Sequence, residues 1–318
     1  MSRVIAAIIQ AEVQSTAGAT LALSAAKARE ARAQGARLLV FPETWLPGYP
    51  AWLDTCRDAA LWNWGPANQA YARLASESVV VGRGGLFEGL QAIARDNEAV
   101  VVCGVTERVD AGPGRGTLYN ALLTLGPDGI LLNHHRKLVP TFSERLVWGP
   151  GDTAGLRAVD TPVGRIGGLV CWEHWMPLAR YALHQSGEDI HVAVWPTVAE
   201  MHVVASRAHG FEGRCFVLAA GSLMKASILP AGLEPHPAKV QSPDALVLRG
   251  GSCIIAPNGQ FVVEPVFDRE AVLVAELDLD QCRVEGFTRD VTGHYQRPDA
   301  FEFSVKPSGR GTPLTIDN

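Results

Sequence analysis

In residues 165–180, RIGGLVCWEHWMPLAR, an apolar strand passes almost directly into a helix. This strand-to-helix unit is typical of an α/β fold. The run RIGGLVC (165–171) predicts a buried strand, and residues 177–187 predict a helix. Cys171 is the last residue of the strand. At such a turn a side chain is exposed at the carboxyl edge of a sheet, and free backbone N–H groups point toward it. This position suits a nucleophile, although most free cysteines are buried structural residues.

Apolar runs and helical patterns alternate on both sides of this stretch. Further strands are predicted at 4–13, 36–43, 99–107, 118–126, 130–137, 190–196, 214–222, 252–264 (a hairpin) and 271–279. Further helices are predicted at 19–34, 84–97 and 203–214. The alternation predicts an α/β protein with mostly buried sheets. Three irregular or Pro/Gly-rich segments, 53–70, 108–116 and 223–250, are expected to be loops near an active-site mouth or an interface.

Length and composition limit the class of protein. The chain has 318 residues, near the upper end for one hydrophobic core, and no low-complexity linker divides it. We therefore expect a single domain over 1–318. Hydrophobic residues make up 47% and charged residues 19%, an ordinary globular balance that argues against disorder. The net charge of -5 and the lack of a basic run disfavour nucleic acid or an anionic membrane as a partner.

The cysteines and the N-terminus bear on location. The six cysteines are scattered without CxxC spacing, so we expect neither a disulfide framework nor a zinc site. The first residues read as a strand rather than a signal peptide, since acidic Glu12 closely follows the apolar run. No apolar run approaches the roughly 18 residues of a membrane-spanning helix. The default expectation is a cytoplasmic protein.

Two more chemically active residues lie at predicted strand ends. Glu43 ends the strand 36–43, and Lys137 ends the strand 130–137, with Glu144 seven residues later. A carboxylate at the end of a core strand is costly unless it is solvated or paired, and either a surface cap or an active-site base would explain it. A lysine there says little by itself. With Cys171, however, the three are expected to share one sheet edge, and burial would raise the pKa of Glu43 toward a range suited to proton transfer.

Other chemistries are disfavoured. His134 and His135 are adjacent on a predicted strand and so face opposite ways, and no HExxH spacing supports a metal site. No GxSxG segment indicates a serine hydrolase. The glycines of GPGRG (112–116) neither follow a clear strand nor open a helix, so they are better explained by a hairpin loop than by a phosphate site.

The same segments carry a family resemblance over nearly the whole chain. FPETWLPGYP (41–50), HRKLVPTFSERLVWGPGD (135–152) and GGLVCWEHWMPLAR (167–180) resemble, in this order, the motifs of the nitrilase superfamily of carbon–nitrogen hydrolases. DVTGHYQRPDAFEF (290–303) resembles the family's C-terminal segment. The resemblance implies an α-β-β-α sandwich that pairs through a helix face into an αββα-αββα dimer. It also implies a triad.

The implied triad falls on Glu43, Lys137 and Cys171, with the second glutamate of many members at Glu144. Cys171-Trp172-Glu173 resembles the nitrilase branch, whereas His174 replaces the Asn of many nitrilases, so the substrate class stays open. The expected reaction converts an organic nitrile to its carboxylic acid and ammonia without metal or cofactor. The alternatives are an amidase of the same superfamily and a catalytically inactive oligomeric binding protein.

The resemblance assigns roles to these residues. Cys171 would attack, with its pKa lowered by Lys137 and the helix start, while Glu43 carries protons. Lys137 and the Trp172 N–H would stabilise charge on the thioimidate nitrogen and the later oxyanion, and Glu144 would hold Lys137 or position water. Trp172 and Trp195 are expected at the substrate pocket. Trp45, Trp52 and Trp175 fit either a pocket or the core, and Glu173 and His174 are expected to support the turn.

The expected partners are a small-molecule nitrile and further copies of the chain, as a homo-oligomer built from dimers. The C-terminal segment, about residues 285–318, is expected at an oligomer interface.

Overall fold

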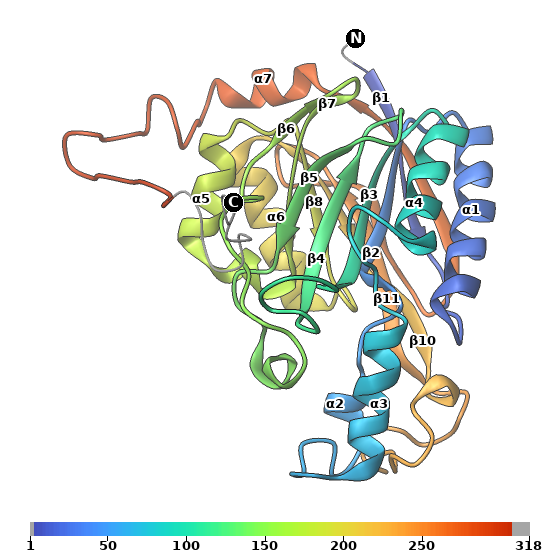
Figure 1. Cartoon of the computed structure of the whole chain (residues 1–318). Coiled ribbons are helices and arrows are strands. Elements are labelled where there is room, and N and C mark those ends of the chain that lie inside the picture. The colour runs from blue at the N-terminus through green and yellow to red at the C-terminus, as the bar shows by residue number, and fades with distance from the viewer. Residues whose placement is uncertain (1–2, 307–318) are drawn as a thin grey trace, which may run out of the picture.

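The computed structural model describes residues 3–306, and they form two sheets that face each other (Figure 1). The first sheet has the order β13-β1-β2-β3-β4-β5. Its strands are β1 (Arg3–Gln10), β2 (Leu38–Leu46), β3 (Val100–Arg108), β4 (Leu118–Leu125), β5 (Leu131–Arg136) and β13 (Ala271–Asp278). The second sheet has the order β10-β11-β9-β8-β7-β6, with β12 paired to β11. Its strands are β6 (Val159–Thr161), β7 (Gly164–Val170), β8 (Ile190–Val194), β9 (Phe216–Ala220), β10 (Leu223–Lys225), β11 (Leu246–Ile255) and β12 (Phe261–Phe267).

Helices cover the outer face of each sheet. α1 (Ala17–Ala33) and α4 (Gly85–Asp96) contact each other and the first sheet, while α5 (Pro177–Gln185) and α6 (Glu200–Gly213) lie on the second (Figure 1). The remaining helices are α2 (Trp52–Thr55), α3 (Gly65–Ser76) and α7 (Asp280–Gly286), with 3-10 turns η1 (Phe142–Leu146), η2 (Cys171–Trp175) and η3 (Ala226–Ile228). The predicted α-β-β-α sandwich is confirmed.

The alternation of side chains along the strands explains the layers. In β1, Ala6 and Ile8 belong to the core between the sheets, whereas Ala7 and Ile9 pack under the helices. In β2, Leu38 and Val40 face the second sheet in the same way. Because successive residues of a strand point to opposite faces, a strand that is apolar throughout fills both layers. This pattern is what the continuous apolar runs predicted.

Two of the predicted loops contain regular structure. Segment 53–70 overlaps α2 and the start of α3, and 223–250 contains β10 and the first residues of β11, so those expectations were wrong in part. Pro66 stands in the first turn of α3, where its missing N–H costs nothing. Ala67, Ala70 and Leu74 recur at helical spacing and are buried in a small apolar cluster with Trp52. Tertiary burial thus made a helix where the local sequence favoured a loop.

No helix among residues 3–306 combines the length and apolarity needed to cross a membrane. Part of the segment 285–318, residues 307–318, lies outside the described residues, and the expected interface role of that segment stays a prediction.

Candidate active site

The nucleophile candidate Cys171 directly follows β7 and opens the turn η2. Its φ of 53° lies in the left-handed region, which a residue with a Cβ rarely adopts. Such backbone geometry costs on the order of 1–2 kcal/mol and persists only where surrounding contacts hold it. The side chain is buried, with 4% of its surface exposed.

Glu173 supplies much of that hold. Its carboxylate accepts the N–H of Val170 at 2.8 Å and the N–H of Leu138 at 2.8 Å, so it ties the end of β7 to the chain beyond β5. His135 Nε2 lies 2.9 Å from the same carboxylate. Burial by itself would raise the pKa of Glu173, but His135 and these N–H groups hold it below its ordinary value. These contacts match the supporting role expected of Glu173.

Lys137 lies between two carboxylates. Its Nζ donates to Glu144 Oε2 at 2.7 Å and to Glu43 Oε1 at 3.2 Å, and all three side chains are buried. Burial would lower the pKa of Lys137, but Glu43, Cys171 and Glu144 together raise it above its ordinary value. Lys137 is therefore a fixed positive charge.

Glu43 reaches the site from within β2 rather than from its end. The β2–β3 ladder is interrupted between Phe41 and Leu46, and Thr44 has a φ of 43°. Gly104 of β3 lies directly against this break, because a Cβ there would stand 2.3 Å from the carbonyl oxygen of Pro42. The expectation that a single sheet edge gathers the residues was wrong, since Glu43 and Lys137 come from the first sheet and Cys171 from the second.

The environment of Glu43 suits it to proton transfer. Asn120 of β4 donates to its Oε1 at 2.6 Å. Burial raises the pKa of Glu43 to about 7, with Lys137 opposing the rise and Glu144 adding to it. A carboxyl group in that range both takes and returns protons near neutral pH.

The sulfur lies close to both carboxylates. The Cys171 sulfur, one carboxylate oxygen of Glu43 and one of Glu144 all lie within 4.8 Å of one another. Burial and then Glu43 raise the pKa of Cys171 well above its ordinary value, and Lys137 with the Trp172 N–H only partly counters them. The predicted lowering of this pKa was wrong, because the thiol is buried next to two carboxylates as well as one ammonium. Cys171 therefore needs a base to lose its proton.

A cavity of about 380 Å³ opens onto this group. Cys171, Glu144 and Tyr49 line it together with Asp54, Phe142, Trp172 and His202. Trp172 is 52% exposed there. Trp195 is fully buried and outside that lining, stacked between His174 at 4.7 Å and His202 at 4.3 Å between ring centroids. Trp195 therefore stands one layer behind the cavity wall.

Comparisons with known proteins show the family of the chain. The carbon–nitrogen hydrolase family model matches residues 5–284. The chain belongs to the carbon–nitrogen hydrolase family. A nitrilase of Paraburkholderia phymatum is 37% identical over 310 residues, covering 94% of this chain and 86% of the relative. An aliphatic nitrilase of Sinorhizobium fredii is 35% identical over 316 residues, covering 99% of both chains.

Solved structures share the fold. A carbon–nitrogen hydrolase of Helicobacter pylori aligns with a TM-score of 0.70 at 18% identity, covering 94% of this chain and 96% of that one. An amidase of Nesterenkonia sp. aligns with a TM-score of 0.63 at 18% identity, covering 88% and 92%. At this identity the likeness concerns the fold alone.

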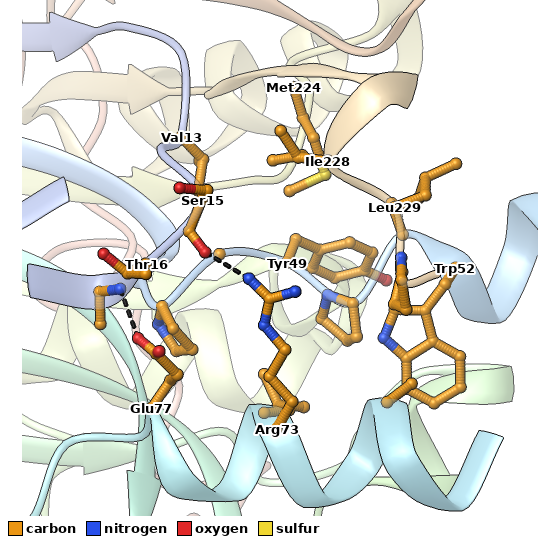
Figure 2. A pocket seen from close by; sticks show the side chains of 18 of the residues that line it. Val13, Ser15, Thr16, Tyr49, Trp52, Arg73, Glu77, Met224, Ile228 and Leu229 are labelled. Carbon is orange, nitrogen blue, oxygen red and sulfur yellow. Dashed lines mark hydrogen bonds between the residues drawn. The ribbon is translucent and has the colours of Figure 1, made fainter. Parts of the chain in front are cut away.

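Two residues of this carbon–nitrogen hydrolase site were missed by sequence reasoning. Asn120 holds Glu43, and its signal was a carboxamide in the apolar strand LYNALLTL. Tyr49 donates its hydroxyl to Glu144 Oε1 at 3.0 Å. Tyr49 also belongs to the wall of a second, smaller cavity of about 90 Å³ (Figure 2). In that cavity Arg73 bonds the carbonyl of Ser15, and Glu77 accepts the N–H of Ala17 (Figure 2).

Two groups of described residues bring possible metal ligands together. Glu43, Glu144 and Cys171 form one, but the Lys137 ammonium already bonds both carboxylates. His184, Glu188 and His209 form the other, where both oxygens of Glu188 are hydrogen-bonded to histidines. His134 and His135, as expected of neighbours in a strand, contact different carboxylates, Glu107 and Glu173.

Proposed function

We propose that this chain is a nitrilase, which hydrolyses an organic nitrile to the carboxylic acid and ammonia. Several relatives named nitrilases, at 35–38% identity over most of the chain, support the activity. The observation that carries the assignment is the cluster in which the Cys171 sulfur and carboxylate oxygens of Glu43 and Glu144 lie within 4.8 Å of one another. Lys137 bonds both carboxylates, and the 380 Å³ cavity gives a small molecule access to the sulfur.

The first half of the reaction forms a covalent thioimidate. The carboxylate of Glu43 takes the Cys171 proton, and the thiolate attacks the nitrile carbon to form a C–S bond. The electron pair moves to nitrogen, which receives the proton from Glu43. Lys137 and the backbone N–H of Trp172 stabilise the charge that develops there.

The second half consumes two water molecules. Glu43 takes a proton from the first water as it adds to the thioimidate carbon and passes this proton to the nitrogen. The tetrahedral intermediate then collapses to a thioester: its hydroxyl proton is transferred to the nitrogen, the C–N bond breaks and ammonia leaves. The second water hydrolyses the thioester and restores the thiol. The balance is one nitrile and two waters to one carboxylic acid and one ammonia. Glu144 and the Tyr49 hydroxyl keep the Lys137 ammonium in place throughout.

The covalent step is tested with Cys171→Ala and a small panel of nitriles and their amides. The variant is expected to release no ammonia, and acid quench of the parent should give a substrate adduct on the Cys171 peptide by mass spectrometry. Cys56→Ser is the matched control, because Cys56 is a partly exposed free cysteine outside the cluster. Ammonia release by Cys171→Ala at the parental rate would refute the assignment.

The same panel separates the alternatives. A nitrilase turns over the nitrile faster than its amide, whereas an amidase of this family shows the reverse order. An inactive binding protein releases ammonia from neither.

We further infer a homo-oligomer built from dimers, with 1–318 as a single catalytic domain and no metal or cofactor. Exposed apolar side chains on α5 and α6 support pairing through this helix face. They are Leu178, Met201, Val204 and Phe211, exposed by 43–70%. Phe287, Tyr295 and Phe301, exposed by 65–94%, support a place for the segment after α7 at an interface. Six free cysteines fit a reducing, cytoplasmic location.

A further inference from the structure

A row of buried polar side chains leads to the backbone of Cys171. The row consists of His174 in η2, His191 in β8 and Glu188 just before β8. His174 and His191 have no exposed surface, and Glu188 is 6% exposed. The proposed reaction makes no use of these groups, and burying them is costly unless their hydrogen bonds are satisfied.

Three hydrogen bonds connect the row to the nucleophile. His174 Nδ1 lies 2.7 Å from the carbonyl oxygen of Cys171. His174 Nε2 lies 2.9 Å from His191 Nε2, and His191 Nδ1 lies 2.8 Å from Glu188 Oε2. The row therefore runs without interruption from a carboxylate to the backbone of Cys171.

Counting protons along the row fixes its charge. The carbonyl oxygen accepts only, so His174 Nδ1 donates, and the ionised carboxylate accepts, so His191 Nδ1 donates. The bond between the two Nε2 atoms needs one more proton. The two rings thus carry three protons, whereas two neutral imidazoles carry two. The pair is a single imidazolium, balanced by Glu188.

The surroundings act on the ionisation of the other members of the row. Burial, together with His191 and His209, lowers the pKa of His174, which disfavours a charge on that ring. Burial would raise the pKa of Glu188, but His191 and His209 hold it well below its ordinary value, so it stays ionised. His209 donates from Nε2 to Glu188 Oε1, and burial lowers its own pKa to about 3.

The other charged groups near the row come from neighbouring elements. From α5, His184 Nδ1 lies 3.7 Å from Glu188 Oε1, and its Nε2 lies 3.7 Å from Glu212 of α6. Cys215, before β9, lies 3.9 Å from Glu188 Oε1. Arg180 donates to the carbonyl of His174 at 2.8 Å and to Glu212 at 3.1 Å. His184 therefore lies between two carboxylates, those of Glu188 and Glu212, whereas Glu188 is the carboxylate that His191 contacts.

We propose that Glu188 and His191 are positioning residues for the nucleophile: Glu188 accepts a hydrogen bond from His191, which donates to His174, which in turn donates to the carbonyl oxygen of Cys171. Cys171 has a left-handed backbone and therefore needs anchors on both sides. Glu173 anchors the preceding N–H group of Val170, and the row anchors the Cys171 carbonyl. This proposal rests on the proposed role of Cys171 as nucleophile.

The first test reads the proton directly. Protein labelled with ¹⁵N-histidine is compared at pH 8 by NMR with His191→Phe. The parent is expected to contain a doubly protonated ring whose signal is missing from the variant, although ordinary histidines, with a pKa of about 6.5, are neutral at this pH. A spectrum in which the signal lost on substitution belongs to a neutral ring would overturn the proposal. This readout does not depend on turnover, so it stands apart from any failure of the nitrilase assignment.

The second test reads the position of the sulfur. His191→Phe is expected to lower kcat by up to about 10²-fold, with KM within about twofold, because a small displacement of a nucleophile slows attack more than binding. Alkylation of Cys171 by iodoacetamide should slow in parallel. His134→Phe is the control, since it removes a histidine that contacts Glu107 and lies outside the row; its kcat should stay within about twofold of the parent. A parental kcat and alkylation rate in folded His191→Phe would overturn the proposal.

Glu188→Gln keeps the hydrogen bonds of the row but removes the charge of the carboxylate. This variant also provides the test if His191→Phe does not fold. The amide N–H that this substitution introduces donates to His191 Nδ1, so a neutral His191 still donates to His174 and the row survives. This variant should keep kcat within about threefold while the doubly protonated signal disappears. Glu188→Leu breaks the row and should lose activity as His191→Phe does. Persistence of the signal in Glu188→Gln, or a metal ion bound at one equivalent by the purified parent, would overturn the proposal.

Discussion

Three features of Glu43 suit it to act as a base. Its side chain is fully buried, it accepts hydrogen bonds from Asn120 and Lys137, and it lies near the Cys171 sulfur. Neither Asn120 nor Lys137 is the main influence on the pKa of Glu43. Burial dominates and raises its pKa to about 7, even with an ammonium at 3.2 Å. A base tuned in this way fits a thiol whose own pKa is raised.

The pH dependence of the rate follows from this value. In the proposed mechanism the ionised form of Glu43 is the active base, so kcat/KM should rise with pH and level off above about 7. The acidic limb is measured from initial rates of ammonia release between about pH 5 and 9. Because Glu43, Lys137 and Glu144 interact, the midpoint belongs to the group as a whole. A profile that is flat across this range would contradict a base of this pKa.

Lys137 is the second test at this scale. Lys137→Met should lower kcat by at least about 10²–10³-fold, since it removes the charge that stabilises developing negative charge on nitrogen. It also leaves two buried carboxylates without their cation, which should move the acidic limb to higher pH. Initial rates over pH for both proteins check this, with Lys27→Met, on the outer helix α1, as the surface control. Parental kcat in Lys137→Met would exclude the proposed role.

At the scale of elements, the close approach of β2 and β3 delivers Glu43 to the site. Gly104 makes it feasible, because a Cβ there would lie 2.3 Å from the Pro42 carbonyl oxygen and 2.7 Å from the Glu43 Cα. Both neighbours are backbone atoms, which cannot rotate away. The position of Glu43 in β2 therefore requires that residue 104 in β3 has no side chain.

Gly104→Ala should consequently do more harm than its one methyl group suggests. Overpacking of this kind costs about 1–3 kcal/mol, and it should lower both the free energy of unfolding in urea and kcat per titrated thiol. Gly18→Ala in α1 is the control, since nothing lies within 4 Å of its added Cβ and helices favour alanine. Equal stability of the two variants would contradict the crowding argument.

At the scale of the whole molecule, the two sheets enclose one shared core, and the outer face of α5 and α6 keeps apolar side chains at the surface. On α6, Met201 and Val204 lie three residues apart and so share a face. In the proposed dimer, a second copy of the chain covers these apolar side chains. That copy would cover Leu178 of α5 as well.

Charges on this face should therefore weaken the assembly. The double variant Leu178→Asp, Val204→Asp is expected to sediment as a smaller species than the parent at the same concentration. Val262→Asp on β12, where the parent side chain is 42% exposed, should leave the sedimentation coefficient unchanged. An unchanged assembly in the double variant would move the interface elsewhere.

Sequence pattern alone predicted the long strands and the helices that cover the sheets, the layered architecture through the family resemblance, and Cys171, Glu43, Lys137 and Glu144 as candidate site residues; it missed α2, α3, α7, β6 and β10. The predicted features depend on local pattern and on residue type at a given place in a motif. The role of Glu173 as a support was also within reach, since it lies two residues beyond the nucleophile.

The direction of each pKa shift and the hydrogen-bond partners of the site residues follow from the tertiary fold. The raised pKa of Cys171 and the row from Glu188 to Cys171 depend on contacts between different segments of the chain. The hydrogen bond from Asn120 to Glu43 joins residues 77 positions apart. Burial and charge balance depend on which segments meet, and the sequence pattern does not encode those distances. For the same reason Trp195, expected at the pocket, stands behind it, and residues 65–70, expected to be a loop, begin α3.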